Sequence, residues 1–268
     1  HRMRPSKLVR AHNMLGGSLE QLAPGRWTRL FLPNMNIAGI PRIPFDLLVH
    51  DLSFLVHPSW FSKKTQLWHR FAQPKELIAR ADRLYTLSTQ TTQALVDMCS
   101  VPKSRITQLA YKPTPLIQIS SPRPIEHPYV LLLASNDPRK NRVCVERAFA
   151  SFFAHHPEWR LVLVGGARPS NTPGQLHLPY LSAEAYQRWL KHAEALLYPS
   201  WYEGFGLPLH EAAALGVPRL ASSAPTVAAS SPKDTVFLPA YAPHAWAQAL
   251  EELAKTVQQG LTKPPRSA

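Results

Sequence analysis

Two glutamates flank a short glycine-containing loop in the second half of the chain, and their spacing indicates a site for a ligand that carries both an anion and hydroxyl groups. The loop is Glu203-Gly-Phe-Gly-Leu207, and Glu211 follows about one turn into the helix that we expect next. Gly204 and Gly206 allow positive φ and a close approach of the backbone to a bound group. The amides at the start of the helix favour negative charge, so we expect a phosphate or diphosphate there. The two carboxylates would repel a phosphate and are better suited to accept hydrogen bonds from the hydroxyls of a sugar.

Two cations occupy a second turn that should lead from a strand into a helix. Arg139 and Lys140 lie in Ser135-Asn-Asp-Pro-Arg-Lys-Asn141. Arginine offers a bidentate fork and lysine a point charge, and both can neutralise a diphosphate. A cation at a helix N-terminus opposes the helix dipole unless an anion binds there. We interpret the pair as part of the anion site; solvated charges at a helix end are the alternative.

A third polar group ends an apolar run in the first half of the chain. Phe45-Asp-Leu-Leu-Val-His-Asp51 predicts a buried strand of a parallel sheet that ends at His50 and Asp51. Residues at such strand ends line the ligand crevice of doubly wound α/β domains. His50 is therefore a candidate for chemistry, whereas Asp51 could orient it or cap the following segment. A histidine that only satisfies local backbone groups is the alternative for His50.

The elements that must position these residues alternate between short apolar strands and helices. In the first half we expect strands at 30–36, 45–51, 82–88 and 106–111, a helix over 62–81 that is interrupted or kinked near Pro74, and a helix from Ser88 toward Met98. In the second half we expect strands at 129–134, 159–166, 193–198 and 218–223, and helices at 142–155, from Ser182, from about Pro208 to Gly216 and at 243–257.

Proline density separates the two halves. Five prolines fall between positions 113 and 128, which forbids regular structure and indicates an interdomain linker. The expected organisation is a first domain at 1–112, a linker at 113–128, a second domain at 129–260 and a tail at 261–268. A chain of 268 residues is long enough for two domains, each with its own core.

The sequence resembles a known enzyme family at the residues just described. Tyr198-Pro-Ser, then Glu203-Gly-Phe-Gly-Leu-Pro with Glu211 eight positions after Glu203, and then Gly216-Val-Pro are similar to the retaining GT-B glycosyltransferases, in particular family 4. The stretches His50 to Phe61 and Arg139-Lys-Asn141 resemble the same family. The resemblance implies an α/β fold of the GT-B type, with two Rossmann-like domains facing a cleft. About 29 residues precede the strand at Leu30, so it also implies a reduced N-terminal domain.

The resemblance assigns roles to individual residues. Glu203 would face the donor sugar, Glu211 would hold the ribose hydroxyls, and the backbone of Phe205, Gly206 and Leu207 would hold the diphosphate. Arg139 and Lys140 would contact the donor phosphates. Gly165 and the 179–181 backbone, which includes Leu181, would border the nucleotide base. His50 would approach the reacting sugar.

The same resemblance implies a co-substrate and partners. The donor would be a nucleotide sugar, with no other cofactor, and the acceptor a glycan or lipid-linked glycan, as in bacterial surface polysaccharide or lipopolysaccharide synthesis. No Asp-x-Asp metal signature is present. Because Arg139, Lys140 and helix amides can replace a cation at the diphosphate, we expect transfer without a metal.

The charge distribution and the composition limit which partners and which location we expect for the protein. Residues 1–127 hold 17 Lys and Arg against 7 Asp and Glu, and residues 128–268 hold 13 against 10, so most of the positive potential belongs to the first half. Such a field attracts nucleic acid, anionic lipid head groups or phosphorylated acceptors alike, and a generally basic surface without a function is the alternative. Nucleic-acid-binding signatures do not accompany it, so we expect no nucleic-acid partner. Apolar runs of 18 residues and a signal-peptide core are both lacking, so a cytoplasmic protein, with peripheral contact to an anionic membrane as an option, is expected.

Cys99 and Cys144 lack metal-ligand spacing and are expected as buried thiols.

Three other functions stay open at this point. A catalytically silent nucleotide-sugar-binding protein would keep the phosphate and ribose contacts without turnover. A basic membrane- or polyanion-binding module would use only the first half, and a GT-B sugar epimerase is disfavoured by the paired glutamates.

Overall fold

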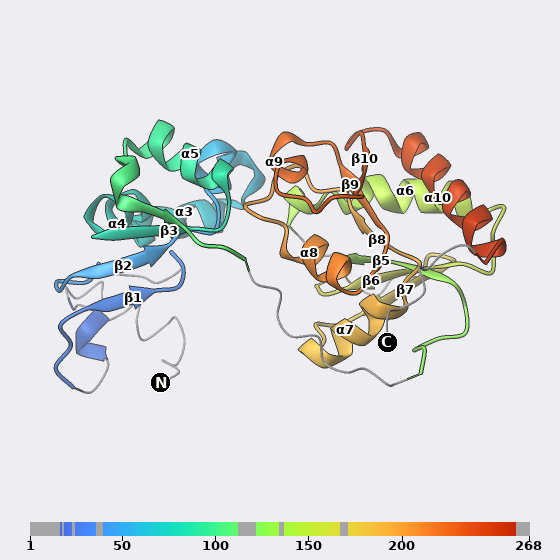
Figure 1. Ribbon diagram of the computed structural model, residues 1–268, viewed down its shortest axis with the longest axis horizontal. Coiled ribbons are helices and arrows are strands. Elements are labelled where there is room, and N and C mark those ends of the chain that lie inside the picture. Colours follow the sequence, from blue (N-terminus) through green and yellow to red (C-terminus); the bar gives the residue numbers. More distant parts are fainter. Residues whose placement is uncertain are drawn as a thin grey trace. The chain divides into compact units, whose positions relative to one another are not determined.

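The computed structural model describes residues 17, 19–22, 25–35, 40–111, 122–133, 137–166 and 171–260. The chain divides into two compact units, His1–Tyr111 and Lys112–Ala268. Each unit is an α/β structure built on a parallel sheet (Figure 1). Much of the expected proline-rich linker, at 112–121, and the expected tail at 261–268 lie outside the described residues.

The first unit holds a sheet of four described strands in the order β1-β2-β3-β4, all parallel. These are β1 (Leu30–Leu32), β2 (Phe45–Leu48), β3 (Arg83–Thr86) and β4 (Ile106–Gln108). Side chains alternate along β2, where Phe45 and Leu47 are buried in the core together with Leu84 of β3. This alternation follows from the two-residue period of a strand and fixes which face of the sheet is covered.

Helices and 3-10 turns connect and cover these strands. They are η1 (Leu19–Leu22), α2 (Ser53–Val56), η2 (Pro58–Trp60), α3 (Lys63–Ala72), α4 (Pro74–Arg80), α5 (Thr89–Cys99) and η3 (Lys103–Arg105). The interruption expected near Pro74 is confirmed, because Gln73 adopts a left-handed conformation with φ of 47° and Pro74 begins a new helix. Proline disfavours helical backbone at the residue before it, which ends α3 there. Ser88 caps α5, as expected, by accepting a hydrogen bond from the Thr91 amide.

The second unit has a sheet in the order β10-β9-β8-β5-β6-β7, again all parallel. Its strands are β5 (Tyr129–Leu133), β6 (Arg160–Val164), β7 (Gln175–Leu178), β8 (Ala195–Tyr198), β9 (Arg219–Ser222) and β10 (Val236–Leu238). Numbered within the unit, the order is 3-2-1-4-5-6, which is the order of dinucleotide-binding Rossmann domains. The direction of chain progression reverses between β5 and β8.

Helices cover both faces of this sheet (Figure 1). On one face, α6 (Arg142–Phe153) and α10 (Pro243–Gln258) share a core with Val130 and Leu132 of β5. On the other, α7 (Ala183–His192), α8 (Leu207–Ala214) and α9 (Pro225–Ala228) share a core with Tyr129 and Leu131. A strand that is buried on both sides needs apolar residues at every position, which explains the run Tyr129-Val-Leu-Leu-Leu133.

The elements that were expected from the sequence are present and differ mainly at their ends, whereas β7, β10, α2 and α9 were not expected. The strand expected over 106–111 ends at Gln108, and the helix expected over 142–155 ends at Phe153. Cys144 is buried as expected, but Cys99 is only half-buried. None of the helices in the described part of the chain combines the length and apolar character needed to cross a membrane.

Candidate functional site

The site residues of the second unit gather where its strand order reverses. Ligands of open parallel sheets bind outside the carboxyl ends of the two strands that flank such a switch point. Here β5 is followed by the 3-10 turn η4 (Pro138–Lys140), which carries Arg139 and Lys140. The neighbouring β8 is followed by the loop that holds Glu203. Sheet order therefore brings two cations and one carboxylate to the same edge.

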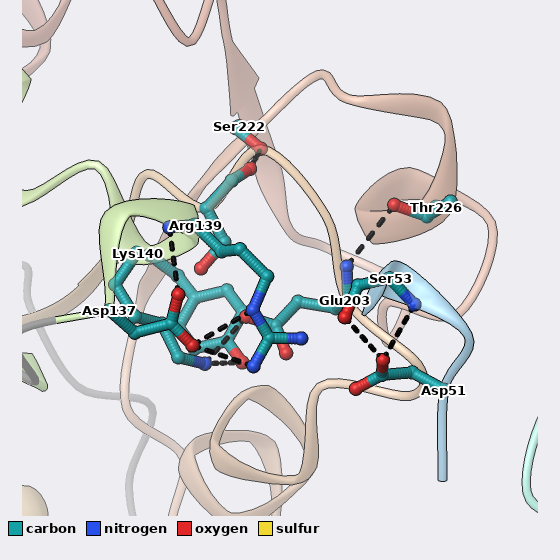
Figure 2. Close-up of polar contacts among 10 residues, drawn as sticks. Asp51, Ser53, Asp137, Arg139, Lys140, Glu203, Ser222 and Thr226 are labelled. Atoms are coloured by element: carbon teal, nitrogen blue, oxygen red, sulfur yellow. Dashed lines mark hydrogen bonds and ion pairs between the residues drawn. The ribbon is translucent and has the colours of Figure 1, made fainter. Parts of the chain in front are cut away.

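Lys140 and Glu203 form an ion pair at this edge (Figure 2). The Lys140 Nζ lies 2.6 Å from Glu203 Oε1, and the side chains are 22% and 13% exposed. Lys140 also donates to the Tyr198 hydroxyl at 3.3 Å and lies 5.0 Å from the centre of that ring. Burial, followed by the charge of Glu203 and a hydrogen bond to it, raises the pKa of Tyr198 well above its usual value. The tyrosine therefore stays protonated and donates to Glu203.

Arg139 is held by a neighbouring carboxylate. Its Nη2 and Nε lie 2.6 and 2.8 Å from Asp137 Oδ2, and its backbone amide donates to Asp137 Oδ1 at 3.0 Å. Burial raises the pKa of Asp137, but hydrogen bonds and charge from Arg139 outweigh it, so the pKa lies below its usual value. Both cations of the site are thus paired with acids in this structure. A diphosphate would have to replace those acids as their partner.

Asn141 connects the loops around the switch point and was not assigned a role from the sequence. Its backbone is left-handed, with φ of 47°. Its side-chain amide donates to the Pro199 carbonyl at 3.1 Å and to the Ala240 carbonyl at 2.6 Å. These acceptors are 58 and 99 residues away along the chain, so no local sequence signal could have identified them. A backbone hydrogen bond from the Trp201 amide to the Arg139 carbonyl also joins the loops after β5 and β8.

The loop after β8 enters α8 as the sequence predicted. Gly206 has φ of 79°, in the left-handed region, and Pro208 lies in the first turn of α8. The expectation of positive φ at Gly204 is wrong; this glycine is buried and its φ is not positive. The Glu203 amide donates to Thr226 Oγ1 of α9 at 3.2 Å, a contact that the sequence did not reveal.

Glu211 lies in α8, on the same loop-helix segment as Glu203. It is half-buried, and desolvation raises its pKa, although the nearby Tyr186 of α7 opposes the shift. A half-buried carboxylate of this kind gains from hydrogen-bond donors such as ribose hydroxyls.

Gly165 and Leu181 follow the neighbouring strands β6 and β7. Gly165 has φ of 85°, and its amide donates to the Leu178 carbonyl at 3.0 Å. A Cβ at this glycine would lie 3.1 Å from the ring of Tyr180, a side chain that is itself 78% exposed. Leu181 packs against the core beneath. Because β6 pairs with β5, Gly165 belongs to the same carboxyl edge as Arg139 and Lys140.

His50 belongs to the first unit, two residues beyond β2. It is exposed, and its Nε2 lies 2.9 Å from the Pro33 carbonyl. Asp51 precedes α2, and its Oδ1 accepts from the Ser53 amide at 2.8 Å and from the Ser53 hydroxyl (Figure 2). The N-cap residue of α2 is Leu52, so Asp51 bonds to the following segment from one residue further back. The role of His50 stays a prediction.

Comparison with protein families gives a match to the second unit. Residues 127–256 match the model of the family described as glycosyl transferases group 1. This range contains the Arg139, Lys140, Glu203 and Glu211 positions. No curated protein matches the chain.

Comparison with solved structures shows the fold. Sucrose-phosphate synthase from Thermosynechococcus elongatus is 19% identical with a TM-score of 0.57, over 82% of this chain and 61% of that one. Anabaena HepE in complex with UDP and glucose is 16% identical with a TM-score of 0.62, over 82% and 65%. An α,α-trehalose-phosphate synthase (UDP-forming) from Burkholderia vietnamiensis is 11% identical with a TM-score of 0.59, over 80% and 61%.

The fold is therefore α/β of the GT-B class, with parallel sheets in both units. The chain spans between 61% and 65% of the length of these three structures. The family match is confined to residues 127–256, within the second unit, and the solved structures show the fold.

Proposed function

We propose that the protein transfers a glycosyl group from a nucleotide sugar to a glycan or lipid-linked acceptor, with retention of the anomeric configuration. One observation carries the proposal: Arg139, Lys140 and Glu203 meet at the carboxyl edge where β5 and β8 adjoin, with Lys140 and Glu203 2.6 Å apart. Cations for a diphosphate and an acid for sugar hydroxyls are thereby available at adjacent points. The match of residues 127–256 to the glycosyl transferases group 1 model supports the same assignment.

In this proposal the diphosphate takes the cations over from their present partners. Arg139 leaves Asp137, Lys140 leaves Glu203, and both then neutralise the charge that develops on the departing nucleoside diphosphate. Electrostatic stabilisation of a leaving group by fixed donors is a large catalytic contribution, because the donors need no reorganisation during the reaction. The released Glu203 accepts hydrogen bonds from the donor sugar.

The remaining donor contacts follow the predicted assignments. Glu211 accepts from the ribose hydroxyls, the Phe205, Gly206 and Leu207 backbone faces the diphosphate, and Gly165 and Leu181 border the base. His50 helps to position the reacting sugar. Because Arg139 and Lys140 supply positive charge at the diphosphate, we propose transfer without a metal ion; activity that persists in EDTA would agree with this.

The proposal is tested by ligand binding and turnover across a panel. Calorimetric titration with UDP, GDP and ADP should give one nucleotide that binds, and the corresponding sugar nucleotides should be hydrolysed slowly without an acceptor. Absence of binding to every nucleoside diphosphate would refute the proposal. Binding without hydrolysis or transfer to any glycan acceptor would instead identify a catalytically silent nucleotide-sugar-binding protein.

A further inference from the structure

The loop proposed to hold the diphosphate is restrained through a histidine. Phe205 stands between Gly204 and Gly206, the residue type with the least restrained backbone. Its ring lies flat on the ring of His210 in the first turns of α8, with centres 4.3 Å apart and planes 3° apart. The stack therefore gives the loop a fixed side-chain contact at a point where its backbone alone has little restraint.

His210 is in turn fixed to the segment after β9. Its Nε2 lies 2.8 Å from the Ser230 carbonyl oxygen. Since a carbonyl oxygen only accepts, Nε2 carries the hydrogen of this bond. Burial lowers the pKa of His210, although the Ser230 bond opposes the shift, so the neutral ring is favoured at neutral pH. The imidazole thus uses its edge for Ser230 and its face for Phe205.

The same segment holds the start of the loop. Thr226 of α9 accepts from the Glu203 amide at 3.2 Å, only four residues before the Ser230 carbonyl that accepts from His210. The segment is itself well anchored, because Val227 is fully buried in the core and the Ser230 and Ser231 hydroxyls bond back to Thr226 and Val227 carbonyls. This segment therefore contacts the loop at Glu203, before Phe205, and α8 at His210, after Phe205.

We infer that His210 is a positioning residue for the diphosphate loop, acting through its stack on Phe205 and its hydrogen bond to the Ser230 carbonyl, together with Thr226. This inference rests on the proposed function for the identity of the ligand. Preorganised donors bind an anion more tightly because less ordering remains to be done on binding. His210 does not touch the ligand and acts on its affinity through the loop.

The test separates the two contacts of the imidazole. His210→Leu removes both, His210→Phe keeps the stack, and His210→Gln keeps a donor for Ser230. Loss of an aromatic pair and a hydrogen bond corresponds to about 5-fold to 150-fold in affinity. We expect His210→Leu to weaken nucleoside-diphosphate binding by about that factor and to raise KM for the donor more than it lowers kcat, with intermediate effects for the other two variants.

Amide hydrogen exchange supplies a second readout that needs no ligand. In His210→Leu, exchange over 203–207 should accelerate by about the same factor, while exchange in α6 stays unchanged. His244→Leu, at an exposed histidine of α10, is the matched control and should change neither quantity. Normal affinity together with normal exchange in His210→Leu would overturn the inference, even if the variant were less stable.

The outcomes also distinguish this inference from the proposed function. If the wild-type protein binds none of UDP, GDP and ADP, the proposed function fails and the assignment of a diphosphate to the loop fails with it, whatever the exchange data show. If the wild-type protein binds one of them and His210→Leu binds it equally well with the same exchange, only the positioning role fails.

Discussion

Replacing Lys140 by methionine tests the anion site most directly. The change keeps most of the side-chain volume and removes the charge. A hydrogen bond to a charged group contributes about 1.5 to 3 kcal/mol, or about 10-fold to 150-fold in affinity. Lys140 already has a partner, Glu203 at 2.6 Å, so a phosphate gains only the difference between the two partners. We therefore expect the lower part of that range, a loss of about 10-fold to 30-fold in nucleoside-diphosphate affinity.

The same substitution affects stability, and that effect must be separated from binding. The Glu203 side chain is only 13% exposed in the wild-type protein. Removal of Lys140 takes away the cation that pairs with this carboxylate, which should lower the unfolding free energy by about 1 to 3 kcal/mol. The double variant Lys140→Met with Glu203→Gln should recover much of that stability but none of the nucleotide affinity. The interaction free energy between Lys140 and Glu203 follows from a double-mutant cycle of the wild type, the two single variants and the double variant.

Isothermal titration with the nucleotide that binds the wild-type protein measures the affinity, and urea unfolding measures the stability. Lys255→Met is the matched control, because Lys255 is 61% exposed and pairs only with a surface glutamate in the same unit. Affinity in Lys140→Met equal to that of the wild type would show that Lys140 does not contact the diphosphate, and the reasoning from the switch point would then be refuted.

Substitutions at four further positions test the surrounding contacts. Asp137→Asn should tighten nucleoside-diphosphate binding by about fivefold, since it frees Arg139 from a competing carboxylate; weaker binding would contradict the competition. Glu211→Gln should raise Tm at neutral pH, because the raised folded-state pKa of Glu211 marks a penalty on its charged form. That penalty is absent below the unfolded-state pKa and complete above the folded-state pKa, so the Tm difference should shrink as pH falls through this range; a constant difference would argue against it. Gly206→Ala should cost about 1 to 2 kcal/mol in urea unfolding because φ is 79°. Asn141→Ala should cost about 1 to 3 kcal/mol by the same measurement, because it removes the hydrogen bonds to two carbonyls. Asn141→Gly removes the same hydrogen bonds but suits the left-handed backbone better, so it should cost less than Asn141→Ala; an equal cost would assign the whole effect to the hydrogen bonds.

Several local features of the protein could be predicted from the sequence because short-range sterics and hydrogen bonding decide them. Ser88 and Ser182 cap their helices as expected, and Pro208 lies in the first turn of α8. Helix interruption at Pro74 follows from the same kind of local rule. The prediction failed at Gly204, whose φ is not positive.

Four strands of the second unit, β5, β6, β8 and β9, were also recognisable from the sequence, but β7, β10 and the strand order were not. The run at β5 is apolar at every position because both faces are covered, and this is visible in the residues alone. Which strand lies beside β5 depends on how the helices pack on the two faces, and that information is spread over the whole unit. The β5–β8 pairing places the switch point, and with it the ligand edge.

The amino-acid sequence by itself determined the residue types of the site: two cations in one turn, and two acids around a glycine loop in another. Only the tertiary structure decided that Lys140 pairs with Glu203, 63 residues away in the sequence, and that Tyr198 donates a hydrogen bond to Glu203. It also decided that Thr226 and His210 hold the loop. The physical reason is that these partners are joined by sheet pairing and core packing, whose specificity lies in the sum of many contacts and not in any short stretch of chain.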